Sequence, residues 1–218
     1  MIFQENRLLS ELCTFGIGGP ARYFISVQTL EEMTNAITKC QQQKLPFFVL
    51  GKGSNCLFDD RGFNGVVIQN KIDFFESPRE GVFHVGAGYS FSLLGVQTAR
   101  QGWSGLEFAS GIPASVGGAV FMNAGANGGQ TFDNLVSADF IDEHGQLLHL
   151  SKESLEFGYR TSSFQKMKGA IVGATFQLTR QAEARKKQLD IVQYRTKTQP
   201  YGDKSAGCVF QNPPSHFA

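Results

Sequence analysis

The chain has 218 residues and a net charge of +1, and its length fits one large domain or two small ones. The near-neutral charge argues against a nucleic-acid or anionic-membrane partner. No run of about 20 apolar residues is present, so we expect no membrane-spanning helix. The first twelve residues lack the basic and apolar segments of a signal peptide. We therefore expect a cytoplasmic protein.

The spacing of cysteines and histidines matches no metal site. The four cysteines form no CxxC pair, and the four histidines form no HExxH pattern. We expect reduced thiols, packed or surface histidines, and no bound metal. The cysteines are Cys13, Cys40, Cys56 and Cys208, and the histidines are His84, His144, His149 and His216.

The first third of the chain predicts a strand, a helix and a second strand. Thr29 and Glu32 form a capping box at the start of the helix, which we expect to end at residues 44–46. The apolar face of this helix is predicted to carry Leu30, Met33, Ile37 and Cys40. Strands are expected at residues 21–27 and 47–50, the second buried on both faces.

A glycine-rich loop, LGKGSNCLF, follows at residues 50–58. It lacks the GxxxxGK[ST] spacing of a phosphate-binding P-loop. It also lacks the GxGxxG dinucleotide fingerprint, because Cys56 stands where the third glycine belongs. The segment GAGYSF at residues 86–91 fails in the same way. The loop could still donate hydrogen bonds to a phosphate through Gly51, Gly53, Ser54 and Asn55, and the alternative is a plain turn between two elements.

The middle of the chain predicts two more strands and a helix. The strands are expected at residues 65–68 and 82–85. The helix is expected at residues 90–100, ending near Gly102, with Leu93, Leu94 and Val96 pointing inward. Trp103 is predicted to pack in the core.

The stretch 105–129, GLEFASGIPASVGGAVFMNAGANGG, is dense in glycine, alanine and serine, and Glu107 is its only ionisable residue. It is too rich in glycine for a good helix or strand, and too apolar for a solvated linker. One reading is backbone that approaches a phosphate group with free N–H groups. The other is a loop tightly packed against the core.

The remaining chain predicts a hairpin, a strand and a charged helix. The hairpin strands are expected at residues 135–142 and 146–150, and a further strand at residues 170–178. The helix is expected at residues 181–194, and the chain then runs on through residues 195–203. The chain after Arg180 is too short to build its own core, so we expect either a polar tail or an incomplete domain.

Six motifs occur in one order over nearly the whole chain. They are TFGIGGPARYF at 14–24, GKGSNCLF at 51–58, GAG at 86–88, GLEFASGIPASVGGAVFMNAGANG at 105–128, FGYRTSSF at 157–164 and KSAGCVFQNP at 204–213. With these motifs the chain resembles the UDP-N-acetylenolpyruvoylglucosamine reductases, flavoenzymes of peptidoglycan synthesis. The resemblance implies an α+β FAD-binding fold of the vanillyl-alcohol-oxidase (PCMH) type. Its two lobes would be about 1–70 and 71–180, and 181–218 would begin a third, substrate-binding lobe.

The resemblance also implies the cofactors and the reaction. FAD, bound non-covalently, would take a hydride from NADPH and pass it to a UDP-sugar enolpyruvyl ether, forming UDP-N-acetylmuramate. The residues implied in FAD binding are Gly51, Lys52, Gly53, Ser54, Asn55, Cys56, Gly111, Ile112, Pro113, Ser115, Val116, Gly117, Gly118, Asn123, Ala124 and Gly125. A monomer is assumed.

The catalytic groups implied by the resemblance are Arg160 and Cys208. The guanidinium of Arg160 would stabilise negative charge beside the substrate carboxylate. Cys208 stands where the family usually has a serine proton donor. A thiol, with a reference pKa of about 8.5, is neutral at pH 7 and a stronger acid than a hydroxyl. Cys208 could instead be a buried apolar residue.

Other features of the resemblance concern the substrate. The family's catalytic glutamate would lie beyond residue 218, and the chain looks like the shorter subtype without a tyrosine-bearing loop. Substrate binding is then expected from Tyr159, Arg195, Lys197 and Lys204. Two alternatives stay open, namely an FAD oxidase of the same fold and a flavin-binding module without catalysis.

Overall fold

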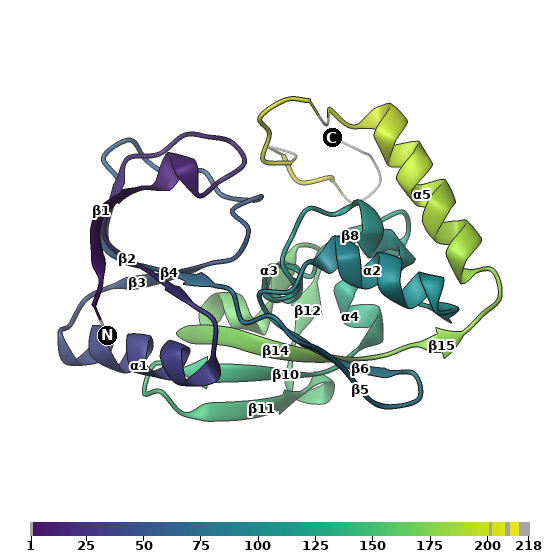
Figure 1. Ribbon diagram of the computed structural model, residues 1–218, viewed down its shortest axis with the longest axis horizontal. Helices are drawn as coiled ribbons and strands as arrows, with labels where there is room; N and C mark the ends of the chain where they lie inside the picture. Colours follow the sequence, from purple (N-terminus) through teal and green to yellow (C-terminus); the bar gives the residue numbers. More distant parts are fainter. Residues whose placement is uncertain (1, 201, 208–209, 214–218) are drawn as a thin grey trace.

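Two β-sheets carry the chain, the first within residues 4–70 and the second within residues 75–177 (Figure 1). The computed structural model describes residues 2–200, 202–207 and 210–213. Each half of the chain contains both strands and helices, so the α+β class is observed. Within the described residues, no helix is both long and apolar enough to cross a bilayer.

The first sheet has the strand order β1-β2-β4-β3. β1 runs antiparallel to β2, whereas β4 runs parallel to both β2 and β3. Helix α1 provides the crossover from β2 to β3, which lie on either side of β4. The segment 51–62 then connects β3 to its parallel neighbour β4. The elements are β1 (Gln4–Leu8), β2 (Pro20–Val27), α1 (Leu30–Gln42), β3 (Phe47–Leu50) and β4 (Phe63–Asn70).

Helix α1 begins where its capping residues predict. Thr29 Oγ1 accepts a hydrogen bond from Glu32 N at 3.1 Å, and Glu32 Oε2 accepts one from Gln28 N at 2.6 Å. The predicted apolar face is confirmed for Met33, Ile37 and Cys40, which are fully buried. The prediction is wrong for Leu30, which is 42% exposed. It is the first helical residue and lies ahead of the turns that contact the sheet.

The second sheet is antiparallel throughout, with the order β11-β10-β14-β6-β5. The predicted hairpin forms, and the predicted strand at 170–178 lies at the centre of the sheet. The elements are β5 (Phe75–Arg79), β6 (Val82–Gly86), β10 (Leu135–Asp142), β11 (Leu147–Ser151) and β14 (Gly169–Gln177).

Helices α2 (Phe91–Arg100) and α3 (Val116–Phe121) cover the inner face of the second sheet (Figure 1). Leu94 is fully buried there and Val96 is half-buried, but Leu93 is 44% exposed, so its predicted inward orientation is wrong. Ser90 caps the helix, which places Leu93 in the first turn on the side away from the sheet. Trp103 packs as predicted, with the Arg180 guanidinium 5.3 Å from its ring centre.

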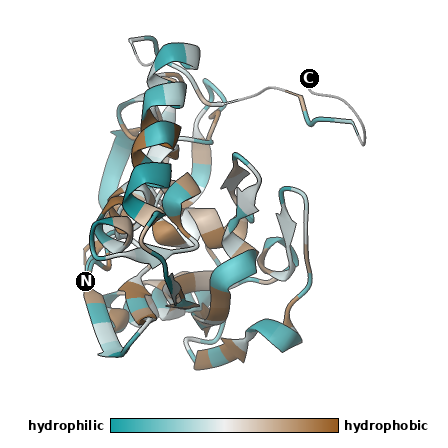
Figure 2. Ribbon diagram, turned by 90° about the vertical axis from the view of Figure 1, so that its right-hand side faces the viewer, coloured by the Kyte–Doolittle hydropathy of each residue, from teal (hydrophilic) through white to brown (hydrophobic). Residues whose placement is uncertain are grey.

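Helix α5 (Ala184–Thr198) lies against α2, on the right in Figure 1. It starts three residues later and ends four residues later than the predicted helix at 181–194. Arg195 and Lys197 are therefore helical, and the predicted end of the helix at residue 194 is wrong. Most of α5 is hydrophilic (Figure 2), so apolar periodicity does not mark its C-terminal end.

Short elements fill the stretch that was predicted to be neither helix nor strand. This prediction is wrong in part, because Ser115 caps a helical turn and burial outweighs the low helix propensity of glycine. The short elements of the whole chain are η1 (Leu9–Glu11), β7 (Trp103–Ser104), η2 (Glu107–Gly111), β8 (Gly125–Ala126), β9 (Gly129–Gln130), α4 (Thr131–Asn134), η3 (Lys152–Ser154), β12 (Phe157–Gly158), β13 (Thr161–Ser162), η4 (Ser163–Lys166) and β15 (Thr179–Arg180).

Candidate functional site

A cavity of about 830 Å³ lies between the two sheets. Its wall from the first half includes β3 and the loop at 51–56. Its wall from the second half includes the N-terminal end of α3 and the start of β14. This one cavity is lined by all six predicted residues of the loop (Gly51, Lys52, Gly53, Ser54, Asn55 and Cys56) and by three of the residues predicted in the central stretch (Ser115, Gly117 and Gly118).

The loop at 51–56 offers backbone donors to the cavity. Within the described residues, the N–H groups of Gly53 and Ser54 have no acceptor in the protein. Gly53 has a φ of +67°, and a Cβ on it would lie 2.1 Å from the carbonyl oxygen of Leu12. Glycine is therefore required at this position. The Gly53 carbonyl accepts a hydrogen bond from Thr14 N at 3.1 Å, which fixes the loop from behind.

The central stretch meets this loop at Ser115. A Cβ on Gly51 would lie 2.3 Å from Ser115 Oγ, so the two backbones approach closely. The N–H groups of the central stretch, however, are mostly engaged within the protein. The N–H groups of Ile112, Val116 and Gly117 donate to the carbonyl oxygens of Ala109, Tyr89 and Ala87, respectively. The expectation of free N–H groups is therefore wrong at these three positions.

Two ionisable groups of the loop are perturbed by burial. Lys52 Nζ donates to Ser90 Oγ at 2.7 Å. Desolvation lowers the pKa of the Lys52 ammonium, and the charge of Asp73 opposes this shift. Desolvation also raises the pKa of the Cys56 thiol, and the neighbouring Cys13 adds to the shift. Cys56 is therefore held as a neutral thiol at the cavity wall.

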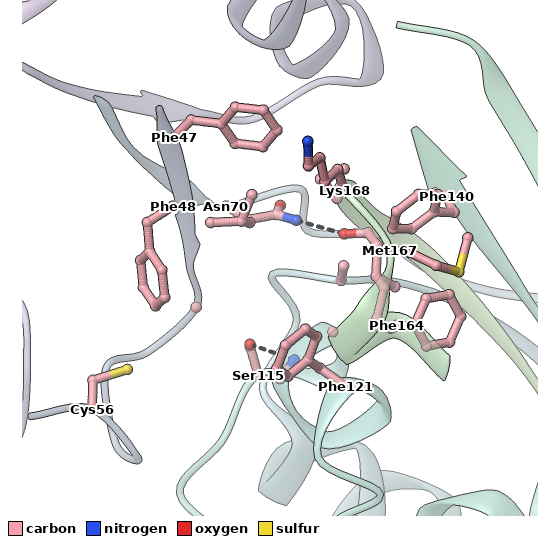
Figure 3. A pocket seen from close by; sticks show the side chains of 18 of the residues that line it. Phe47, Phe48, Cys56, Asn70, Ser115, Phe121, Phe140, Phe164, Met167 and Lys168 are labelled. Atoms are coloured by element: carbon pink, nitrogen blue, oxygen red, sulfur yellow. Dashed lines mark hydrogen bonds between the residues drawn. The ribbon is translucent and has the colours of Figure 1, made fainter. Parts of the chain in front are cut away.

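Apolar side chains form much of the remaining cavity wall, together with polar ones such as Glu143 and Lys168. Figure 3 shows Phe47 and Phe48 on opposite sides of β3, with Phe164 and Met167 on the facing wall. Asn70 joins the two walls, because its Nδ2 donates to the carbonyl oxygen of Ile171 at 2.8 Å. The sequence analysis missed these residues. The apolar run of β3 was predicted to be buried on both faces, which is wrong at Phe48, because it is 40% exposed. An unbroken apolar run does not tell which side of a strand faces a cavity.

The predicted residues Tyr159 and Arg160 lie in the tight turn between β12 and β13. Arg160 has a φ of +58°, and its Nη2 donates to the carbonyl oxygen of Gly125 at 2.9 Å. Its guanidinium carbon lies 4.9 Å from the ring centre of Tyr159, which is 48% exposed. The Ala124 carbonyl accepts hydrogen bonds from Thr131. The turn and the segment around Gly125 are thus in direct contact.

Arg195 lies across Gly111. A Cβ on Gly111 would lie 2.0 Å from Arg195 Cδ and 2.3 Å from Nε, so this glycine makes room for the side chain. Arg195 Nε is buried and has no hydrogen-bond partner within the described residues. The structure therefore brings together two predicted site residues that are 84 positions apart in the sequence. Pro113, another predicted site residue, lies two positions after Gly111.

The other two predicted basic residues, Lys197 and Lys204, lie at the C-terminal end of α5 and beyond it. Lys197 is exposed in the last turn of α5. The side chain of Lys204 packs against Gly16, and Thr14 Oγ1 donates to the Ser205 carbonyl at 2.7 Å, so this segment contacts the N-terminal loop. Cys208 lies outside the described residues. Among the residues that are described, no group of three or more His, Cys, Asp or Glu could hold a metal ion.

Comparison with known proteins agrees with this geometry. The model of an FAD binding domain matches residues 21–151. The UDP-N-acetylenolpyruvoylglucosamine reductase of Protochlamydia amoebophila (strain UWE25) is 65% identical over 211 residues, which cover 97% of this chain and 71% of that protein. The chain belongs to the UDP-N-acetylenolpyruvoylglucosamine reductase family. The reductase of Chlamydia trachomatis serovar L2 is 48% identical over 210 residues, covering 96% of this chain and 72% of that one.

A solved member of the reductase family has the same fold. The crystal structure of UDP-N-acetylenolpyruvylglucosamine reductase from Thermus caldophilus aligns with a TM-score of 0.84 at 37% sequence identity. The alignment covers all of this chain and 78% of that one. The resemblance inferred from the motifs and the α+β FAD-binding fold are therefore confirmed.

The cavity fits the FAD of this family. Its volume lies within the range of about 300–1,000 Å³ that is typical of cofactor sites. A dinucleotide has an anionic diphosphate between flat ring systems. The unpartnered N–H groups of Gly53 and Ser54 suit the diphosphate, and walls such as Phe47 and Met167 suit the rings.

Proposed function

We propose that this chain reduces UDP-N-acetyl-enolpyruvoylglucosamine to UDP-N-acetylmuramate with NADPH, as an FAD-dependent oxidoreductase of peptidoglycan precursor synthesis. The observation that carries this function is 65% identity to a named reductase over 97% of the chain. The cavity between the sheets supports it, because it provides free backbone donors and apolar walls. We further propose a cytoplasmic location and a monomer.

The two sheets support a division into cofactor lobes at about 1–70 and 71–180, with 181–218 beginning a substrate lobe. In this arrangement the loop at 51–56 holds the FAD diphosphate through the N–H groups of Gly53 and Ser54. When bound, FAD supplies hydride transfer between NADPH and the substrate. The protein binds NADPH and the substrate and excludes water from the space between its lobes.

Arg160 is the proposed electrostatic partner of the substrate carboxylate. Hydride addition to the enolpyruvyl methylene carbon moves the alkene electrons toward the carboxylate-bearing carbon. A guanidinium stays charged and has five N–H donors in a fixed fork. One of them reaches Gly125 O, which leaves donors for a carboxylate. Tyr159, beside it and half exposed, is a proposed substrate contact.

A proton must then reach the carboxylate-bearing carbon, and Cys208 is the proposed donor. Its thiol proton would complete the lactyl ether, so that NADPH and one proton are consumed for each product formed. The basic residues Arg195, Lys197 and Lys204 are proposed contacts for substrate phosphates. The buried, unpartnered Nε of Arg195 supports its assignment most directly.

The function is tested by the visible absorption of the FAD-loaded protein under anaerobic conditions. NADPH should bleach the flavin band, and the enolpyruvyl substrate should restore it. Rapid recovery with oxygen instead of substrate would indicate an oxidase of the same fold. Failure of the protein to bind FAD would contradict the assignment of the cavity, and bleaching without recovery would contradict the proposed substrate.

A further inference from the structure

The turn that carries Arg160 is held in an uncommon backbone conformation. Its φ of +58° lies in the left-handed region, where side chains other than glycine, asparagine and aspartate are rare. Such a conformation persists only where the surrounding structure enforces it. The contacts that hold this turn therefore decide where the Arg160 guanidinium points.

Asn123 makes the central contact with this turn. The residue is 1% exposed. Asn123 Nδ2 donates to the Gly158 carbonyl at 2.9 Å and to Gln130 Oε1 at 3.0 Å, and its Oδ1 accepts from Phe132 N at 3.0 Å. Both amide hydrogens are used within the protein, so none is left for a cofactor. The place of Asn123 in the FAD cradle, which the resemblance implies, stays a prediction and would have to involve atoms other than these amide hydrogens.

The Arg160 side chain returns to the same short segment. Its Nη2 donates to the carbonyl oxygen of Gly125, two residues after Asn123. Residues 123–125 therefore hydrogen-bond both to the backbone before the turn, at Gly158, and to the guanidinium of Arg160. Asn123 itself has a φ of +40°, which suits asparagine and places its amide beneath Gly158.

We propose that Asn123 is a positioning residue for Arg160. By holding the Gly158 carbonyl, it sets the turn so that the guanidinium can contact Gly125 and present its remaining N–H donors to the substrate carboxylate. This inference rests on the proposed function of Arg160. A small rotation of the turn would leave FAD binding intact and would move the guanidinium away from the developing charge.

The decisive variant is Asn123→Asp, which keeps the size and the left-handed backbone preference but removes both amide hydrogens. The measurement is the anaerobic single-turnover rate at which the enolpyruvyl substrate restores the flavin band after NADPH reduction. We expect this rate to fall between about tenfold and a hundredfold. The FAD content and the rate of bleaching by NADPH should each change by less than about twofold, because neither depends on the orientation of Arg160.

A double-mutant cycle separates positioning from a general structural effect. In an Arg160→Ala background, Asn123→Asp should change the rate by less than about twofold, because the group on which it acts is gone. Equal losses in both backgrounds would overturn the inference. The matched control is Asn134→Asp, since Asn134 Nδ2 also donates to a glycine carbonyl, that of Gly105, at 2.8 Å. It should leave the rate within about twofold.

Three further outcomes are informative. If Asn123→Asp loses FAD, Asn123→Gly is measured in the same way, because glycine accepts the positive φ without strain; loss of FAD in both variants would show a structural role and overturn the inference. If the unmodified protein does not recover its flavin band with substrate, the proposed function fails instead. If Arg160→Ala alone leaves the rate unchanged, the role of Arg160 is wrong and the inference with it.

Discussion

The loop at 51–56 and the stretch at 111–118 are both rich in glycine and both border the same cavity, yet their glycines serve different purposes. In the loop, the N–H groups of Gly53 and Ser54 remain without an acceptor within the described residues. In the second stretch, the N–H groups of Ile112, Val116 and Gly117 are engaged, and Gly117 also permits close packing against Ala87. Glycine content alone does not distinguish a backbone offered to a ligand from one packed against protein.

Gly117→Val should give the largest effect, on the packed side of this comparison. A Cβ at Gly117 would lie 2.9 Å from Ala87 Cβ, so a larger side chain forces α3 away from β6. We expect the free energy of unfolding of the FAD-free protein to fall by about 2–3 kcal/mol, measured by urea denaturation. Gly118→Val is the control, since a Cβ there meets only Ser115 Oγ, at 3.2 Å. An equal loss in both variants would contradict the packing role.

FAD itself should stabilise the folded protein by binding between the sheets. At a concentration one hundred times its dissociation constant, FAD should raise the free energy of unfolding by about 2.7 kcal/mol. Urea denaturation at several FAD concentrations measures this linkage. A denaturation midpoint that does not depend on FAD would show that the cavity does not bind it.

Gly51→Ala tests the side that faces the ligand. The added methyl would meet Ser115 Oγ at 2.3 Å and separate the loop from α3. We expect the dissociation constant for FAD to rise about tenfold, or 1.4 kcal/mol, with the stability of the FAD-free protein changed by less than about 1 kcal/mol. Fluorescence titration measures the affinity. Gly202→Ala, where an added Cβ meets nothing within 4 Å, should bind FAD normally, and equal affinities for both would refute this role of Gly51.

Alkylation of Cys56 should give the smallest effect. Burial raises the pKa of its thiol, so its thiolate fraction, and with it the rate of reaction with iodoacetamide, should increase from pH 8 to pH 9. FAD should slow the reaction at least about threefold by covering the cavity wall. Cys40, with a pKa raised by burial to about 11, should stay unmodified in the folded protein. Peptide mass spectrometry gives both rates, and unchanged labelling of Cys56 with FAD would place the cofactor elsewhere.

Local signals predicted much of the fold. The cap at Thr29 and the β10–β11 hairpin were correct because each depends on residues close in sequence. Leu30 and Leu93 were wrong because both lie in a first helical turn, where helical spacing does not show which side reaches the core. The end of α5 was missed because its position depends on packing against α2 and η2 rather than on its own pattern.

The parts of the site that lie within sequence motifs could be predicted. The parts that depend on contacts between residues distant in sequence could not. The loop at 51–56 and Ser115 could be placed near one ligand from the motifs that carry the family resemblance, although their contact with FAD stays a prediction. The contact of Gly111 with Arg195 and the hydrogen bond from Asn70 to Ile171 join residues that are distant in sequence. No local pattern marks such pairs. The hydrogen bonds of the Asn123 side chain to Gly158, Gln130 and Phe132 were likewise not predictable from its motif.

The position of β14 has a consequence for the order in which each new chain matures. β14 lies between β10 and β6, so the second sheet stays open until residues 169–177 have left the ribosome. The first sheet needs only residues up to 70 and can fold earlier, because synthesis favours N-terminal units. Its half of the cavity, including Phe47, then faces solvent without its opposite wall. Cofactor capture is therefore a late event in biosynthesis, and the interval before it is when the nascent chain most needs protection from aggregation.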